Sequence, residues 1–242
     1  PPLHGPVVRV QLSWQSDTSR QSNFIERLPE AAEEPIASEV NLSRFPVLAI
    51  AISGNVNERV INKYAKELNI TKKLAGCNFK LEDYRKTNSK YNKIVSVEMI
   101  EAVGSKYLPI YIETIKKCLQ KDGHAIIQGI TIADEKFSEY RRQVDFIQKY
   151  IFPGGFLPSK KLLEKIADTK QLQIEVLEDF NPSYVKTLSM WREKFNKKWP
   201  HIKSLGYDDK FKRIWNYYLS YCEAGFCEDS IQISIFKLSH MK

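Results

Sequence analysis

The sequence lacks long hydrophobic runs, paired cysteines and clustered histidines. Its longest apolar runs, such as Val47 to Ile52, have the length of one strand, whereas a membrane-spanning helix needs about 20 residues. Nor does it open with the charged-then-apolar pattern of a signal peptide. The four cysteines are scattered: Cys77, Cys118, Cys222 and Cys227. This spacing is typical of reduced thiols in a cytosolic protein, and with four equally scattered histidines no metal site is expected.

The charge is basic but not concentrated. There are 37 Lys and Arg residues against 29 Asp and Glu, a formal net charge of +8. A basic surface attracts polyanions, which include both nucleic acid and anionic lipid. The basic residues are spread over many predicted helices, and the chain has neither a basic tail nor an aromatic RNA-binding motif. We therefore expect no nucleic-acid partner, and charge alone does not select another.

The first 45 residues differ in composition from the rest. They are rich in Pro, Ser, Gln and Glu and show little periodicity, which is typical of a linker or a poorly ordered extension. Only Val7 to Val10 has the character of a strand. The chain, at 242 residues, suits one domain with an appendage. We therefore divide it into an atypical extension (residues 1–45) and one domain (residues 46–242).

From Val47 onward, strand and helix patterns alternate. The predicted strands are 47–52, 79–81, 94–97, 124–132, 172–177 and 231–238. The predicted helices are 57–68, 108–119, 134–150, 159–167, 182–199 and 208–222. This alternation predicts an α/β domain with a mostly parallel sheet. In such sheets ligands bind beyond the carboxyl ends of the strands.

Polar residues follow two of these strands. Asp83 could bind an amine and Tyr84 could stack on a flat ring, although an ordinary turn explains both. Glu101 lies among apolar residues just past strand 94–97, where a carboxylate is costly to bury without a partner. Glu98 is three residues earlier and would share a face with Glu101 on a helical turn. One of these two glutamates is expected to be only a surface residue.

A loop of unusual composition spans Tyr150 to Ser159 and reads Y-I-F-P-G-G-F-L-P-S. Loops are normally polar, because backbone groups outside regular structure are best hydrated. Two prolines stiffen this one, and its large side chains are apolar. It is therefore expected to cover something apolar, which could be the core, a ligand or a membrane.

Four segments together resemble the cyclopropane fatty acid synthases, which are S-adenosylmethionine-dependent methyltransferases. They read K-I-V-S-V-E-M-I-E-A-V-G, Y-I-F-P-G-G-F-L-P-S, Y-V-K-T-L-S-M-W and F-K-R-I-W-N-Y-Y-L-S-Y-C-E-A-G-F. The resemblance runs from about Val47 to Leu238, with the motifs in the family's order. It implies a Rossmann-like class I methyltransferase sheet with inserted helices.

The resemblance also implies a reaction. The family transfers a methylene unit from S-adenosylmethionine to a cis double bond in the acyl chain of a membrane phospholipid, and a bound bicarbonate ion accepts the proton that is lost. The implied cofactors are thus S-adenosylmethionine and bicarbonate. The implied partner is unsaturated phospholipid at a membrane surface, reached by a peripherally attached cytoplasmic protein. A homodimer is left open.

Roles for individual residues follow from the same resemblance. Glu101 and Tyr184 match residues near the bicarbonate ion, as do Gln128 and Ile130. Gln128 is a departure, because the family commonly has a histidine there, and an amide can donate to an anion but cannot replace the imidazole. The implied cofactor contacts are Ile52, Asp83, Tyr84 and Val97. The implied wall of the lipid channel contains Phe152, Pro153 and Gly154.

A larger departure lies upstream of Val47. The superfamily's first strand leads into a glycine-rich turn that approaches the cofactor, and nothing before Val47 has a G-x-G pattern. The first strand is therefore missing or replaced, with Val7 to Val10 as the candidate. Three interpretations stay open: a diverged but intact enzyme, a truncated member that binds a lipid or a protein partner, or another S-adenosylmethionine-dependent methyltransferase with a small-molecule substrate.

Overall fold

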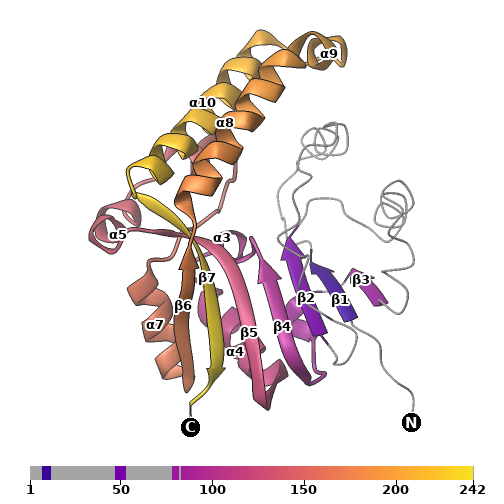
Figure 1. Ribbon diagram of the computed structural model, residues 1–242, viewed down its shortest axis with the longest axis vertical. Helices are drawn as coiled ribbons and strands as arrows, with labels where there is room; N and C mark the ends of the chain where they lie inside the picture. The colour runs from indigo at the N-terminus through magenta and orange to yellow at the C-terminus, as the bar shows by residue number, and fades with distance from the viewer. Residues whose placement is uncertain (1–6, 12–46, 53–77, 82, 242) are drawn as a thin grey trace.

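The computed structural model describes residues 7–11, 47–52, 78–81 and 83–241. The predicted helix 57–68 and Cys77 lie outside these ranges. The described residues contain a sheet with the strand order β3-β1-β2-β4-β5-β7-β6 (Figure 1). Its members are β1 (Val7–Gln11), β2 (Val47–Ile52), β3 (Asn78–Leu81), β4 (Tyr91–Val97), β5 (Leu119–Ile132), β6 (Leu172–Asp179) and β7 (Ile231–His240).

Strand β1 takes the place of the first strand of the sheet. It lies between β2 and β3 and runs parallel to both, with Val8 opposite Ala49 on one side and Phe79 on the other. The segment before Val47 thus supplies the first strand, as the Val7–Val10 pattern predicts. The division of the chain at residue 45 stays a prediction.

The other six strands form where the sequence predicts them. Strand β4 joins β2 and β5 in parallel, whereas β7 runs antiparallel to both β5 and β6. The sheet is therefore mostly parallel with one reversed strand. The carboxyl ends of β4, β5 and β6 lie at the same edge, and this edge carries the candidate site.

Helices α4 (Leu108–Cys118) and α7 (Lys160–Thr169) help to bury one side of the sheet. Helix α4 begins with Pro109 in its first turn, where the missing N–H has no intrahelical partner to lose. Its buried side chains recur at helical spacing, from Leu108 through Tyr111 and Ile112 to Ile115. Together with the inward residues of β4, β5 and β7 they form the main core.

The single helix predicted over 134–150 is wrong, because the structure has two short ones. Helix α5 covers Asp134–Tyr140 and helix α6 covers Phe146–Tyr150. The chain leaves the helix between them because Asp145 and Gln148 form a capping box that starts α6 anew.

A helical hairpin projects from the carboxyl edge of the sheet (Figure 1). Helix α8 (Asn181–Lys197) follows β6, the short α9 (Trp199–Ser204) turns the chain, and α10 (Asp209–Cys227) returns to β7. Aromatic side chains hold the outer half together, with Phe195, Trp199 and Phe211 in contact. Across residues 83–241 no helix is both long and apolar enough to cross a bilayer.

Candidate functional site

The ends of β4 and β5 bring the predicted residues Glu101, Gln128 and Ile130 together. Val97, the last residue of β4, lies opposite Gln128 in the sheet register. The next residue, Glu98, donates its backbone N–H to the Gln128 carbonyl at 3.0 Å and accepts the Gln128 side-chain amide on Oε1, also at 3.0 Å. Ile130 donates its N–H to Glu101 Oε1 at 2.5 Å. These bonds join Glu98 to Gln128 and Glu101 to Ile130, and the four residues form one polar cluster.

The short helix α3 (Ile100–Val103) brings Glu101 to this cluster, and Gly129 makes its position possible. A Cβ atom at residue 129 would lie 2.4 Å from Ile100 Cδ1 and 3.3 Å from Glu101 Oε1. Because Ile100 is fully buried, it has no room to withdraw. Sequence reasoning missed Gly129, although a glycine inside a predicted strand indicates close backbone approach.

The electrostatics of the cluster are those of two half-buried acids that lie close together. Glu101 Oε2 is buried and has no hydrogen-bond partner among the described residues. Burial raises the pKa of Glu101 to about 8, and the negative charge of Glu98 adds to the shift. Burial also raises the pKa of Glu98, although the hydrogen bond from Gln128 opposes it. Two acids in such a place resist ionising together, so the pair retains a proton near neutral pH.

The expectation that one glutamate is only a surface residue is therefore wrong. Glu98 precedes α3 rather than sharing a helix with Glu101, and it is half-buried against β5. Its backbone has φ +50°, a left-handed conformation that a residue other than glycine adopts at a cost of roughly 1–3 kcal/mol. The fold thus holds Glu98 in a strained position beside Gln128.

Residues of the helical hairpin line the same cluster. Tyr184 packs against the same group of buried side chains as Ile130. Burial raises the pKa of Tyr184, and the negative charges of Glu98 and Glu101 add to the shift. Burial likewise raises the pKa of Tyr218 and takes that of Cys222 to about 12, so this thiol stays protonated. Tyr184 thus joins the other three predicted catalytic residues.

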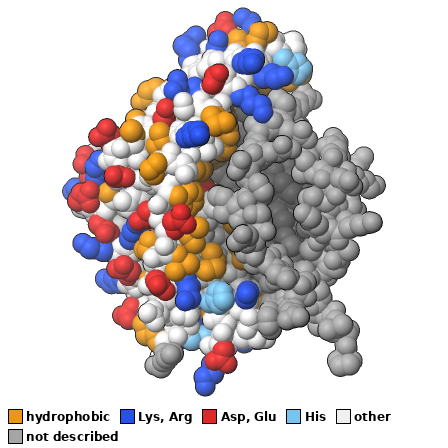
Figure 2. Space-filling view, in the orientation of Figure 1, with side chains coloured by type: hydrophobic (Ala, Val, Ile, Leu, Met, Phe, Trp, Pro, Cys, Tyr) orange, Lys and Arg blue, Asp and Glu red, His pale blue; other side chains and the backbone are white. Residues whose placement is uncertain are grey.

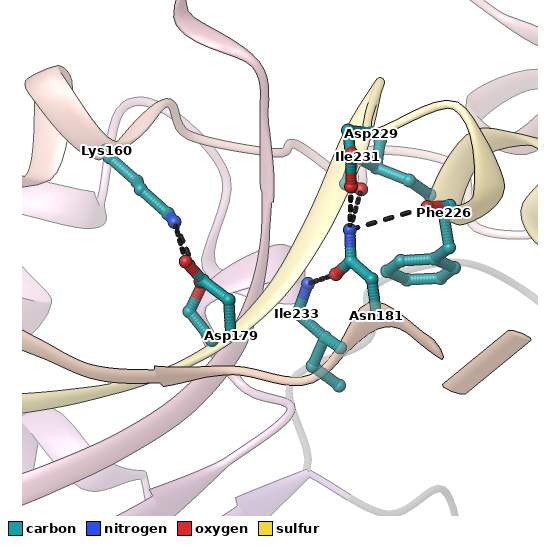
Figure 3. Close-up of polar contacts among 8 residues, drawn as sticks. Lys160, Asp179, Asn181, Phe226, Asp229, Ile231 and Ile233 are labelled. Atoms are coloured by element: carbon teal, nitrogen blue, oxygen red, sulfur yellow. Dashed lines mark hydrogen bonds and ion pairs between the residues drawn. The ribbon is translucent and has the colours of Figure 1, made fainter. Parts of the chain in front are cut away.

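Asn181 fixes the start of α8 and so the position of Tyr184 one turn later (Figure 3). Its amide donates to Asp229 Oδ1 at 2.7 Å and to the carbonyls of Ile231 and Phe226 at 3.3 and 3.4 Å. Its own oxygen accepts the Ile233 N–H at 2.9 Å. One buried side chain therefore ties α8 to the end of α10 and to β7.

Just before α8, the end of β6 is also anchored. Asp179 accepts the Lys160 ammonium at 2.8 Å, which joins β6 to the start of α7 (Figure 3). The Ser234 hydroxyl donates to the same carboxylate at 2.5 Å and joins it to β7. The start of the hairpin is thus held from two sides of the sheet edge.

The apolar loop 150–159 lies against the site. Phe156 donates its N–H to the Glu101 carbonyl at 2.8 Å, and the ring of Phe152 meets that of Tyr218 edge-on, with centroids 6.0 Å apart. Phe152 is 44% exposed, and Pro153 and Gly154 are exposed with it. Gly154 has φ +84°, which glycine adopts without strain. The loop therefore forms a rim next to the carboxyl pair, and its contact with a lipid chain stays a prediction.

The predicted cofactor residues lie along the same carboxyl edge. Ile52 ends β2, and Val97 ends β4 with 36% of its surface exposed; contact of either residue with the cofactor stays a prediction. Asp83 is bound by the Arg85 guanidinium, which holds the pKa of that carboxyl below its usual range. Tyr84 is only 4% exposed and packs edge-on against Tyr111. A buried ring leaves little surface for stacking, so the cofactor role of Tyr84 has no support from its position and stays a prediction.

The described residues do not fit a bicarbonate ion. The Ile130 N–H is bound to Glu101 and one N–H of the Gln128 amide to Glu98, so two of the donors that the resemblance places near the ion are already used within the protein. A second carboxylate also adds negative charge where an anion would bind. In residues 83–241 and the three described strands before them, no three His, Cys, Asp or Glu side chains gather to hold a metal ion.

Comparison with known proteins identifies related sequences. The family model described as mycolic acid cyclopropane synthetase matches residues 38–236. Tuberculostearic acid methyltransferase UfaA1 of Mycobacterium tuberculosis is 40% identical over 145 residues, which is 60% of this chain and 34% of that protein. Cyclopropane-fatty-acyl-phospholipid synthase of Escherichia coli is 35% identical over 154 residues, or 63% of this chain and 38% of that protein. The match thus spans little more than a third of these relatives.

Solved structures share the fold. The mycolic acid cyclopropane synthase CmaA1, in complex with SAH and CTAB, superposes with a TM-score of 0.68 at 17% identity, over 98% of this chain and 79% of that one. A phosphoethanolamine N-methyltransferase of Haemonchus contortus gives 0.61 at 16% identity, over 100% of this chain and 50% of that one. At such identities the likeness establishes the class I methyltransferase fold alone.

Proposed function

Because the chain belongs to the mycolic acid cyclopropane synthetase family, we propose that it transfers a one-carbon unit from S-adenosylmethionine to the cis double bond of an unsaturated phospholipid acyl chain. The observation that carries this proposal is the half-buried carboxyl pair of Glu98 and Glu101 beside Tyr184, at the carboxyl edge of a methyltransferase sheet. The product is a cyclopropane or a methyl-branched chain.

The chemistry explains why such a site is apolar and acidic. Bound S-adenosylmethionine supplies an electrophilic methyl group, and its transfer to an alkene leaves a positive charge on the acyl chain. That charge must not meet water, so the surroundings should exclude it. The half-buried ring of Tyr184 and the buried ring of Phe226, 4.9 Å apart, and the rim residue Phe152 provide apolar surroundings. An aromatic face can also stabilise a cation.

A carboxylate with a raised pKa suits the last step, in which the cationic chain loses a proton. A general base works best when its pKa lies near the operating pH. Glu101, whose pKa burial raises to about 8, meets that condition. Its neighbour Glu98 and the hydroxyl-bearing Tyr184 complete the polar part of the site.

Next to the apolar rim lies a surface suited to a lipid bilayer. Exposed apolar side chains from α6, α10 and their flanking loops share it: Val144, Tyr150, Phe152, Tyr217 and Tyr221. The Phe146 ring ties α6 to α10 through Tyr217, with centroids 4.4 Å apart. On the face drawn in Figure 2, hydrophobic side chains reach the surface among basic and acidic ones. Tyrosines favour the membrane interface, and nearby basic residues such as Arg141 and Lys149 favour anionic headgroups.

A product assay tests the proposal. The full chain is incubated with methyl-labelled S-adenosylmethionine and vesicles of mono-unsaturated phospholipid, and the released fatty acids are analysed by mass spectrometry. Labelled acyl chains that have gained one carbon are expected, and Glu101→Gln should abolish them. Methylation of a small molecule without any lipid product would instead support another methyltransferase class.

A further inference from the structure

Glu98 and Gln128 form a unit that the family resemblance does not explain. The amide of Gln128 stands where a histidine is common, and it donates to Glu98 Oε1 at 3.0 Å. The two residues are also joined through their backbones at 3.0 Å, so the pair is fixed at both ends. One N–H of the Gln128 amide is therefore bound to a carboxylate of this protein.

The groups around this unit come from several elements. Glu101 lies on α3, Ile130 on β5, Tyr184 on α8 and Tyr218 on α10. In the described part of the chain, the only neighbouring charge that shifts the pKa of Glu101 is that of Glu98. Among the described residues, no cation balances the two carboxyl groups of the site, and one proton is the simplest counter-charge.

From this arrangement we infer that the Glu98–Glu101 carboxyl pair, held in place by Gln128, is itself the proton acceptor and replaces a bound bicarbonate ion. This inference rests on the proposed function. Glu101 is the member closer to catalysis, because its Oε2 is buried and has no partner in the described residues. Glu98 is a positioning residue that sets the proton count of the pair.

The proposed step balances as follows. The π electrons of the acyl double bond form a carbon–carbon bond to the transferred methyl group, and the carbon–sulfur bond breaks with its electron pair left on sulfur. A carboxylate oxygen of the pair then takes a proton from the cationic product. The electrons of that C–H bond close the three-membered ring or form a new double bond. The pair goes from one proton to two and returns the extra proton to solvent after release.

The backbone of Glu98 supplies a well-behaved test variant. At φ +50° glycine is less strained than glutamate, so Glu98→Gly should fold at least as well as the parent chain. Glu98→Gln keeps the size of the side chain and removes only its charge. Glu164→Gln, on the exposed face of α7, is the matched control.

The first measurement does not depend on turnover. Infrared spectra of the full chain are recorded across a pH series, and the band of protonated carboxylic acid is followed. In the parent chain and in Glu164→Gln a component should titrate well above the range of ordinary carboxyl groups, and Glu101→Gln should remove it. In Glu98→Gln its midpoint should move to lower pH, because the repelling charge is gone. An unchanged midpoint would overturn the inference.

The second measurement is lipid methylation with and without added bicarbonate. The parent chain should turn over equally in both, and Glu98→Gln and Glu98→Gly should lose at least about 10-fold in kcat with little change in KM for phospholipid. Turnover that requires bicarbonate and is unaffected by either substitution would overturn this inference while the proposed function stands. If the parent chain transfers no methyl group to lipid, the proposed function fails and the inference falls with it.

Discussion

Replacing Asn181 by alanine should loosen the base of the helical hairpin. The side chain is only 7% exposed and joins the start of α8 to α10 and β7 (Figure 3). Two of its hydrogen bonds are short, at 2.7 Å to Asp229 and 2.9 Å from Ile233, and two are long, at 3.3 and 3.4 Å. Alanine leaves the Ile233 N–H without its acceptor, and burying an unpaired polar group costs about 1–3 kcal/mol.

Adding the loss of the short bond to Asp229, we expect Asn181→Ala to lower the free energy of unfolding by about 2–4 kcal/mol. Urea unfolding of the full chain, monitored by tryptophan fluorescence, gives the free energy of unfolding from the midpoint and the slope of the transition. The matched control is Asn196→Ala on the same helix, where the amide is exposed and bonds to Asn216 and Arg192. It should cost about 0.5 kcal/mol or less. Equal losses in the two variants would refute the anchoring role of Asn181.

Three further perturbations follow from the site. Gly129→Ala should lower the free energy of unfolding by about 1–3 kcal/mol and impair catalysis, because its Cβ would collide with Ile100. Urea titration measures the first effect and the lipid assay the second. A stability and a turnover rate equal to those of the parent chain would contradict the prediction. Glu101 has a pKa of about 8 in the folded chain and an ordinary value of 4.5 when exposed. Its contribution to stability, roughly 3–5 kcal/mol, is therefore fully present below pH 4.5 and should be lost as the pH rises through about 8. Glu101→Gln should flatten that dependence in urea titrations across pH, and an unchanged slope would contradict it. Tyr217→Ser should weaken co-sedimentation with anionic vesicles several-fold, whereas the exposed control Tyr107→Ser should not. Equal vesicle binding by the two variants would show that the surface around Tyr217 does not contact lipid.

Local patterns determined much of the fold. The Val7–Val10 run predicted the strand that completes the sheet, and the spacing of Leu108, Tyr111 and Ile115 predicted α4. The break between α5 and α6 was not predicted, because the apolar pattern of the sequence continues through it. A capping box at Asp145 outweighs that pattern, and it becomes visible only when side-chain hydrogen bonds are considered.

The site was predicted in part for a different reason. Glu101, Gln128, Ile130 and Tyr184 could be chosen from a family resemblance, and the structure brings them together at the end of β5. The role of Glu98 could not be predicted, because its contact with Gln128 depends on the β4–β5 register and on a left-handed backbone angle. Neither feature is encoded in the spacing of residues along the chain.

The measurement closest to the central claim is a calorimetric titration of the full chain with S-adenosylhomocysteine, the demethylated form of the methyl donor. If the chain is a methyltransferase, binding of about −8 kcal/mol, a Kd near 1 μM, is expected. Glu101→Gln should bind equally, because Glu101 acts on the lipid rather than on the donor. The absence of binding by a chain that circular dichroism shows to be folded would contradict the account.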